Sequence, residues 1–96
     1  MLPVKAFEAR LRAILDMLDQ AAEDIDDEDF DDLNAELEDA LFMLSQIDPK
    51  SGDAEEELAG ALEELAALKD DYARWPEAGE AAARLGMLIE MASANA

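Results

Sequence analysis

The chain has 96 residues and a net charge of -19, because 26 acidic residues stand against seven Lys and Arg. It has no Cys, which excludes disulfides and thiol chemistry, and no His, which removes the commonest general base and transition-metal ligand. A surface this acidic repels nucleic acid and anionic lipid and attracts basic proteins, so we expect no direct contact with nucleic acid or membrane.

The composition predicts a single all-α domain over residues 1–96. Val4 is the only Val and Thr is absent, whereas Ala and Leu, both strong helix formers, are abundant. No apolar run is long enough to span a bilayer, and the first residues lack the features of a signal peptide. We therefore expect a cytoplasmic protein.

The first two predicted helices cover residues 3–24 and 29–47. Apolar residues spaced alternately three and four apart mark both as heptad seams: Val4, Phe7, Leu11, Ile14, Leu18, Ala21 and Ile25, then Phe30, Leu33, Leu37, Ala40, Leu44 and Ile47. The stretch DIDDEDF separates them and offers Asp27 or Asp29 as an N-cap. Since it holds no Gly or Pro, one long continuous helix is the alternative.

The turn DPKSGD leads into a third predicted helix at residues 53–73, opened by a capping box of Asp53 and Glu56. Its seam is Ala54, Leu58, Ala61, Leu65, Leu68, Tyr72 and Trp75. The pair Trp75-Pro76 ends it, because the residue before Pro is pushed out of the helical region. We expect Trp75 to close one end of the core.

The fourth predicted helix, residues 76–93, has a thin seam of Ala78, Ala81, Leu85, Leu88 and Ala92. All four seams are widened at the e positions, by Leu15, Leu41, Leu62 and Ile89. A stripe this broad suits a helix with two neighbours. The sequence thus predicts an antiparallel bundle of four helices, alone or completed by homodimerisation.

No catalytic or metal-binding motif is found. In the acidic run around residue 30 no register gives the Gly and the terminal Glu of a calcium loop; starting at Asp27, for example, puts Asp32 where Gly belongs. No Asp or Glu falls on an a or d position, so none is expected to be a buried acid for proton transfer. We expect a non-enzymatic protein without metal or cofactor.

Two surface features are candidates for binding a basic partner. Acid pairs recur every seven residues at the f and g positions of the third helix: Glu56 and Glu57, Glu63 and Glu64, Asp70 and Asp71. Phe42 takes an outer f position next to Met43 and near Glu38 and Asp39, which is typical of an interface anchor with an acidic rim. Burial of Phe42 under a neighbouring helix is the alternative.

Met87 and Met91 on the thin fourth helix are a third candidate, because Met is common on adaptable binding surfaces. The alternative interpretation is that they fill the core. Our leading hypothesis is a nucleic-acid-mimicking inhibitor or regulator that covers a basic, nucleic-acid-binding surface of another protein. The second is an acidic adaptor or export chaperone that binds an amphipathic client segment through Met87 and Met91, and the third is a structural or assembly subunit.

Overall fold

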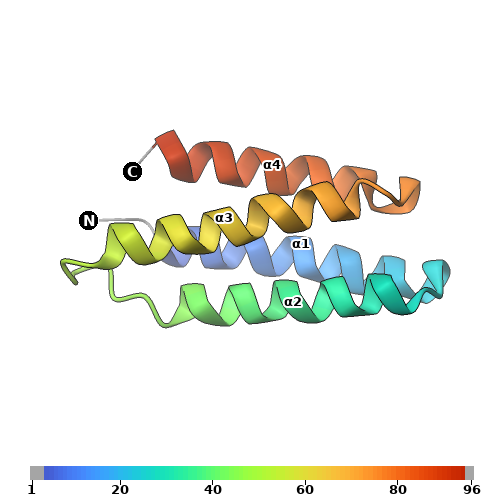
Figure 1. Cartoon of the computed structure of the whole chain (residues 1–96), viewed down its shortest axis with the longest axis horizontal. Helices are drawn as coiled ribbons and strands as arrows, with labels where there is room; N and C mark the ends of the chain where they lie inside the picture. The colour runs from blue at the N-terminus through green and yellow to red at the C-terminus, as the bar shows by residue number, and fades with distance from the viewer. Residues whose placement is uncertain (1–3, 95–96) are drawn as a thin grey trace.

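The computed structural model describes residues 4–94, and they form a bundle of four helices (Figure 1). The helices are α1 (Val4–Ile25), α2 (Glu28–Ser45), α3 (Ala54–Tyr72) and α4 (Gly79–Ala94), with a short 3-10 helix, η1 (Pro76–Ala78), before α4. No strand forms among the described residues. The predicted fold is confirmed, while the predicted helix start at residue 3 lies outside the described residues.

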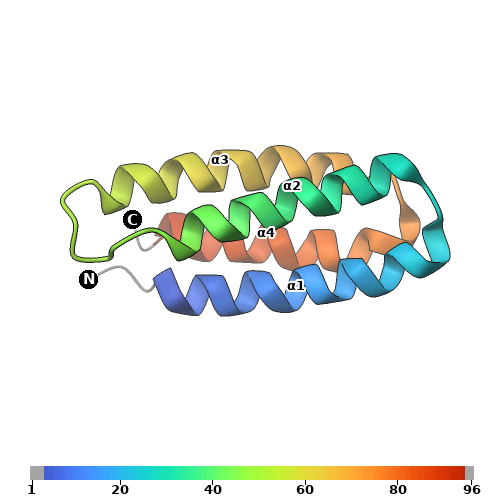
Figure 2. The same cartoon turned by 90° about the horizontal axis from the view of Figure 1, so that it is seen from below.

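Each helix packs on the next one along the chain, and α4 closes the ring by packing on α1 (Figures 1 and 2). The connections are short, which makes successive helices antiparallel. The bundle extends over 42 × 21 × 18 Å. As a consequence, α2 and α3 form one side of the molecule, and α1 and α4 form the opposite side.

The core consists of the a and d residues that the heptads predict. All of them are buried except Ala21, Ile25 and Trp75, which are half-buried. Burying one such Leu or Phe side chain contributes about 1.5–3 kcal/mol relative to leaving it in water. The heptad seams are therefore the main source of stability, and the remaining positions are free to carry surface charge.

Helices α1 and α2 are separate, so the alternative of one continuous helix is wrong. Asp26 has a φ of 47°, a left-handed conformation that short polar residues tolerate better than most. The carboxylate of Asp27 accepts a 2.9 Å hydrogen bond from the backbone N–H of Asp29. Of the two predicted N-caps, Asp27 is therefore the one that starts α2.

The capping box predicted for α3 is wrong, because Asp53 makes no side-chain cap hydrogen bond. Its backbone lies at φ -95° and ψ 1°, not in the extended conformation that a capping side chain usually requires. The N–H of Asp53 donates to Oγ of Ser51 at 3.2 Å, which fixes the turn in this geometry. Helix α3 consequently begins at Ala54 without that cap.

Three aromatic rings close the end of the core where α3 turns into α4. Phe30 meets Tyr72 and Trp75 edge to face, with ring centroids 5.6 Å and 5.3 Å apart. Trp75 is extended, as expected before Pro76, and α3 ends at Tyr72. The fourth α-helix starts only at Gly79, because Pro76 opens a 3-10 turn and not the predicted α-helical turn.

Candidate protein-binding surfaces

The acids of α2 and α3 dominate one side of the bundle. Helix α2 carries seven acidic residues and no Lys or Arg, and α3 carries seven acidic residues and Lys69. On the opposite side, α1 has five acids against Lys5, Arg10 and Arg12. We call the acids of α2 and α3 the acidic face: Glu28, Asp29, Asp31, Asp32, Glu36, Glu38, Asp39, Glu55, Glu56, Glu57, Glu63, Glu64, Asp70 and Asp71.

Helix stability explains only part of this acidity. Acids in the first turns of α2 and α3 interact favourably with the positive end of the helix dipole. Asp70 and Asp71 lie in the last turn of α3, where the dipole disfavours negative charge.

All of the acidic face is exposed except Glu64, which is half-buried. The predicted f and g columns therefore do form a solvent-facing surface.

Phe42 is exposed, which rules out the alternative that a neighbouring helix buries it. Its side chain is 64% exposed and that of Met43 is 46% exposed, although both sit on a helix of the bundle. Glu38 and Asp39 precede Phe42 by four and three residues, so they lie one turn away on the same helical surface. Phe42 and Met43 thus form an exposed apolar pair next to acids of the acidic face.

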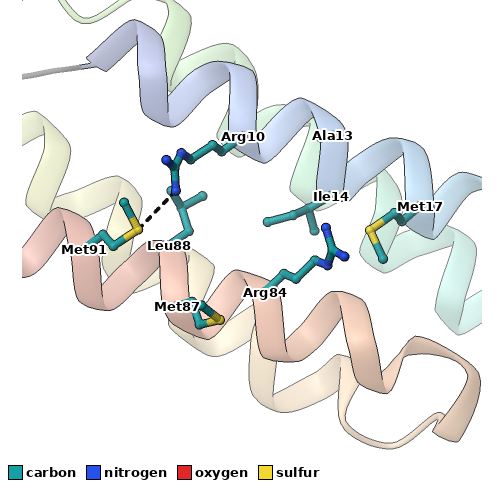
Figure 3. Close-up of a pocket in the computed structure, with 8 residues that line it drawn as sticks. All are labelled: Arg10, Ala13, Ile14, Met17, Arg84, Met87, Leu88 and Met91. Atoms are coloured by element: carbon teal, nitrogen blue, oxygen red, sulfur yellow. Dashed lines mark hydrogen bonds between the residues drawn. The ribbon is translucent and has the colours of Figure 1, made fainter.

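A groove of about 410 Å³ runs between α1 and α4, on the other side of the bundle (Figure 3). Its walls are lined by Arg10, Ile14 and Met17 from α1 and by Arg84, Met87 and Met91 from α4. Met87 is 63% exposed and Met91 is 37% exposed, so the interpretation of both as core filler is wrong.

The two arginines of the α1–α4 groove are held by different contacts. Nη1 of Arg10 donates to Sδ of Met91 at 3.2 Å, across the groove from α1 to α4 (Figure 3). Arg84 pairs with Glu80 of its own helix at 3.3 Å. The sequence prediction missed Arg10, Met17 and Arg84, because their convergence depends on which helices are neighbours.

A second hollow of about 350 Å³ lies between α3 and α4. Leu62 and Ile89, the e residues of the two helices, are half-buried in it, and Glu55 and Glu63 are at its margin. Ala59 and Ala66 are also among its lining residues, and their small side chains leave space there. It has acids and no cation among its lining residues, so it extends the acidic surface more than it adds a separate site.

Asn34 and Tyr72 form a buried polar pair that the sequence prediction did not include. Tyr72 donates a 2.7 Å hydrogen bond to Asn34, and burial raises the pKa of the Tyr72 phenol, with Asp19 and Glu36 adding to the shift. The sequence feature that could have identified Asn34 is its polar side chain at an e position, where other helices carry Leu or Ile. Since Tyr72 is fully enclosed, the pair is a structural element and offers no access to a substrate.

The structure gives no metal centre and no membrane span within residues 4–94. No group of three or more Asp or Glu side chains there is arranged to hold a metal ion. None of the helices there is both long enough and apolar enough to cross a membrane.

Comparison of the chain with known protein families, with curated proteins and with solved structures gives no significant match.

Proposed function

We propose that the protein is a non-enzymatic binding module whose acidic face covers a basic, nucleic-acid-binding surface of another protein. The observation that carries this proposal is the placement of fourteen acids and a single Lys on two adjacent helices. A charge of this size costs stability through self-repulsion, and it exceeds the magnitude of about 2–8 that keeps a small domain soluble. Binding to a basic partner would explain this excess of acidic residues.

Phe42 and Met43 add the apolar contact that charge alone does not supply. Charged contacts at a rim mainly steer association, whereas a large apolar side chain at the centre of an interface carries much of the affinity. Phe42 is exposed and is preceded by Glu38 and Asp39 on the same helix. The acidic face would thus attract the partner, and Phe42 would anchor it.

Displacement from nucleic acid tests this function. Basic proteins of the host lysate are loaded on immobilised duplex DNA, and the protein is added in solution. We expect it to release a specific partner, and we expect the release to weaken as ionic strength rises from about 0.05 M to about 0.5 M. Release of no component, or release that salt does not affect, contradicts the proposal.

Two variants that lose the same number of negative charges distinguish an effect of the acidic face from an effect of the net charge. In the first, four acids of α3 are neutralised to Gln or Asn: Glu56, Glu57, Glu63 and Asp70. In the matched control, four exposed acids of the other side are neutralised: Asp16, Glu23, Glu77 and Glu90. We expect only the first variant, and Phe42→Ser, to lose partner release. Equal loss in both charge variants contradicts a specific face.

The α1–α4 groove favours a second candidate function, that of an adaptor holding an amphipathic client segment. Exposed Met87 and Met91 at the groove walls are the supporting observation, because helix-in-groove binding uses adaptable apolar side chains. Replacing both with Ser should abolish binding of such a client and leave DNA displacement by the acidic face unchanged. Unchanged client binding contradicts this second candidate.

A further inference from the structure

The α1–α4 groove carries its two arginines at diagonally opposite corners. Figure 3 shows Arg10 beside Met91 at one end and Arg84 beside Met17 at the other. Arg10 and Met17 are seven residues apart on α1, which corresponds to about 10.5 Å along the helix axis. The two arginines therefore project from opposite walls of the groove, at positions about two helical turns apart along it.

The groove differs in charge from the rest of the molecule. No acidic residue lines it, whereas two of the seven Lys and Arg residues of the chain do. A guanidinium has five N–H donors, whereas Arg10 donates to Sδ of Met91 and Arg84 donates to Oε1 of Glu80, one acceptor atom each. Both arginines thus keep donors for an incoming carboxylate, a pairing that can be bidentate.

We propose that the groove binds an amphipathic helix of a partner protein whose apolar stripe is flanked by acidic residues about two turns apart. The stripe would cover Ile14, Met87 and Met91, and one acid would reach each arginine. This inference rests on the second candidate function and specifies the chemistry of its client. Charge complementarity selects this occupant: a helix flanked by Lys or Arg would place like charges against Arg10 and Arg84.

Two other occupants fit the groove less well. A fatty acid has one carboxylate, which can satisfy only one of two arginines placed on opposite walls. A second copy of this chain, docked by the same face, brings its own Arg10 and Arg84 to the interface and so places like charges against each other. Both are outcomes that the experiment distinguishes.

Two synthetic peptides provide the test. Both are helices of about eighteen residues, or five turns, with the same Leu stripe, and the flanking positions hold Glu in one peptide and Lys in the other. Binding of each labelled peptide to the full chain is followed by fluorescence anisotropy. We expect the Glu peptide to bind in the groove and to lose about tenfold in affinity when Arg10→Gln and Arg84→Gln are combined.

The matched control is Lys50→Gln combined with Arg74→Gln, which removes the same charge from exposed positions outside the groove. We expect this control to bind the Glu peptide like the unmodified protein. Equal weakening in both double variants, or no Glu-peptide binding at all, overturns the inference. The Lys peptide should respond to neutralisation of the acidic face and not to changes in the groove.

Further outcomes separate the inference from the function on which it rests. If Met87→Ser with Met91→Ser abolishes Glu-peptide binding but the Arg10 and Arg84 changes do not affect it, the adaptor function stands and the acidic preference is overturned. If dodecanoate binds the groove more tightly than the Glu peptide does, the inference of a helical client is overturned in favour of a lipid-like ligand. A dimer in sedimentation that the Met variants dissociate overturns it in favour of a second copy.

Discussion

The phenol of Tyr72 donates a 2.7 Å hydrogen bond to Oδ1 of Asn34, and both side chains are buried between the helices. The amide nitrogen of Asn34 also donates to the carbonyl of Leu18 at 3.3 Å and to Oδ1 of Asp19 at 3.4 Å. One side chain of α2 thus joins α1 and α3. Within residues 4–94 no buried polar side-chain atom lacks a partner, so this small network is fully satisfied.

Asn34→Leu should destabilise the fold by about 1–3 kcal/mol, although Leu is the residue type found at other e positions. The cost arises because the phenol of Tyr72 is left buried without an acceptor. Urea unfolding followed by the fluorescence of Trp75, the only Trp, measures the free energy of unfolding.

A double-mutant cycle with Tyr72→Phe is the control for this prediction. Phe removes the orphaned hydroxyl, so the double variant should be more stable than the sum of the two single changes implies, with a coupling of about 1–2 kcal/mol. Strict additivity of Asn34→Leu and Tyr72→Phe would show that the hydrogen bond contributes nothing to stability.

Tyr72 should also make the protein lose stability at alkaline pH. Burial raises the pKa of its phenol above the value of about 10 found in unfolded chains, so between these two values the unfolded state has lost a proton that the folded state keeps. Protonated Tyr72 makes its full contribution to the free energy of unfolding below pH about 10, and this free energy falls as the pH rises above about 10. Tyr72→Phe should show a shallower alkaline decline than the unmodified protein.

Near-ultraviolet absorbance of tyrosinate tests the cause directly, because Tyr72 is the only Tyr in the chain. We expect its titration midpoint to lie above pH 10 in the folded protein and to return to about 10 in urea. A folded-state midpoint at the ordinary value would contradict the raised pKa.

The heptad pattern was enough to predict the four helices and most of their buried residues, because a and d positions face the core in any bundle. It left the break before α2 open, since the stretch between the first two seams holds no Gly or Pro. It did not predict the α1–α4 groove. Arg10 and Met91 both occupy g positions, and which outer positions meet depends on how the helices are ordered around the bundle. The same limit applies to Phe42, because an f position is exposed only if no neighbour covers it.

Added salt should stabilise the protein. The described residues contain one ion pair, Arg84 with Glu80, and it is exposed and worth only about 0.3–0.5 kcal/mol. Screening therefore weakens far more repulsion among the acids than attraction. We expect the melting temperature, measured by circular dichroism, to rise with NaCl, and to rise less in the variant with four neutralised acids on α3. A melting temperature that falls with salt would mean that the acids are mainly paired.

Gly60 and Gly86 provide a matched pair of helix-interior glycines. Replacing Gly with Ala in a helix usually stabilises it by about 0.5–1 kcal/mol, because Gly loses more backbone entropy on folding. A Cβ on Gly60 meets nothing within 4 Å, so Gly60→Ala should give this full gain. A Cβ on Gly86 lies 2.9 Å from Cε of Lys69, so Gly86→Ala should gain less because the Lys69 side chain must move.

Lys69→Ala tests whether the Lys69 side chain is the cause of the difference between Gly60 and Gly86. In that background the obstacle next to Gly86 is gone, so Gly86→Ala should gain as much as Gly60→Ala, while the gain from Gly60→Ala should not change. Urea midpoints of the six proteins measure these gains, since a midpoint shift at constant slope reports stability. If Gly86→Ala gains the same with and without Lys69, the side chain yields at no cost and the predicted difference between the two glycines has another origin.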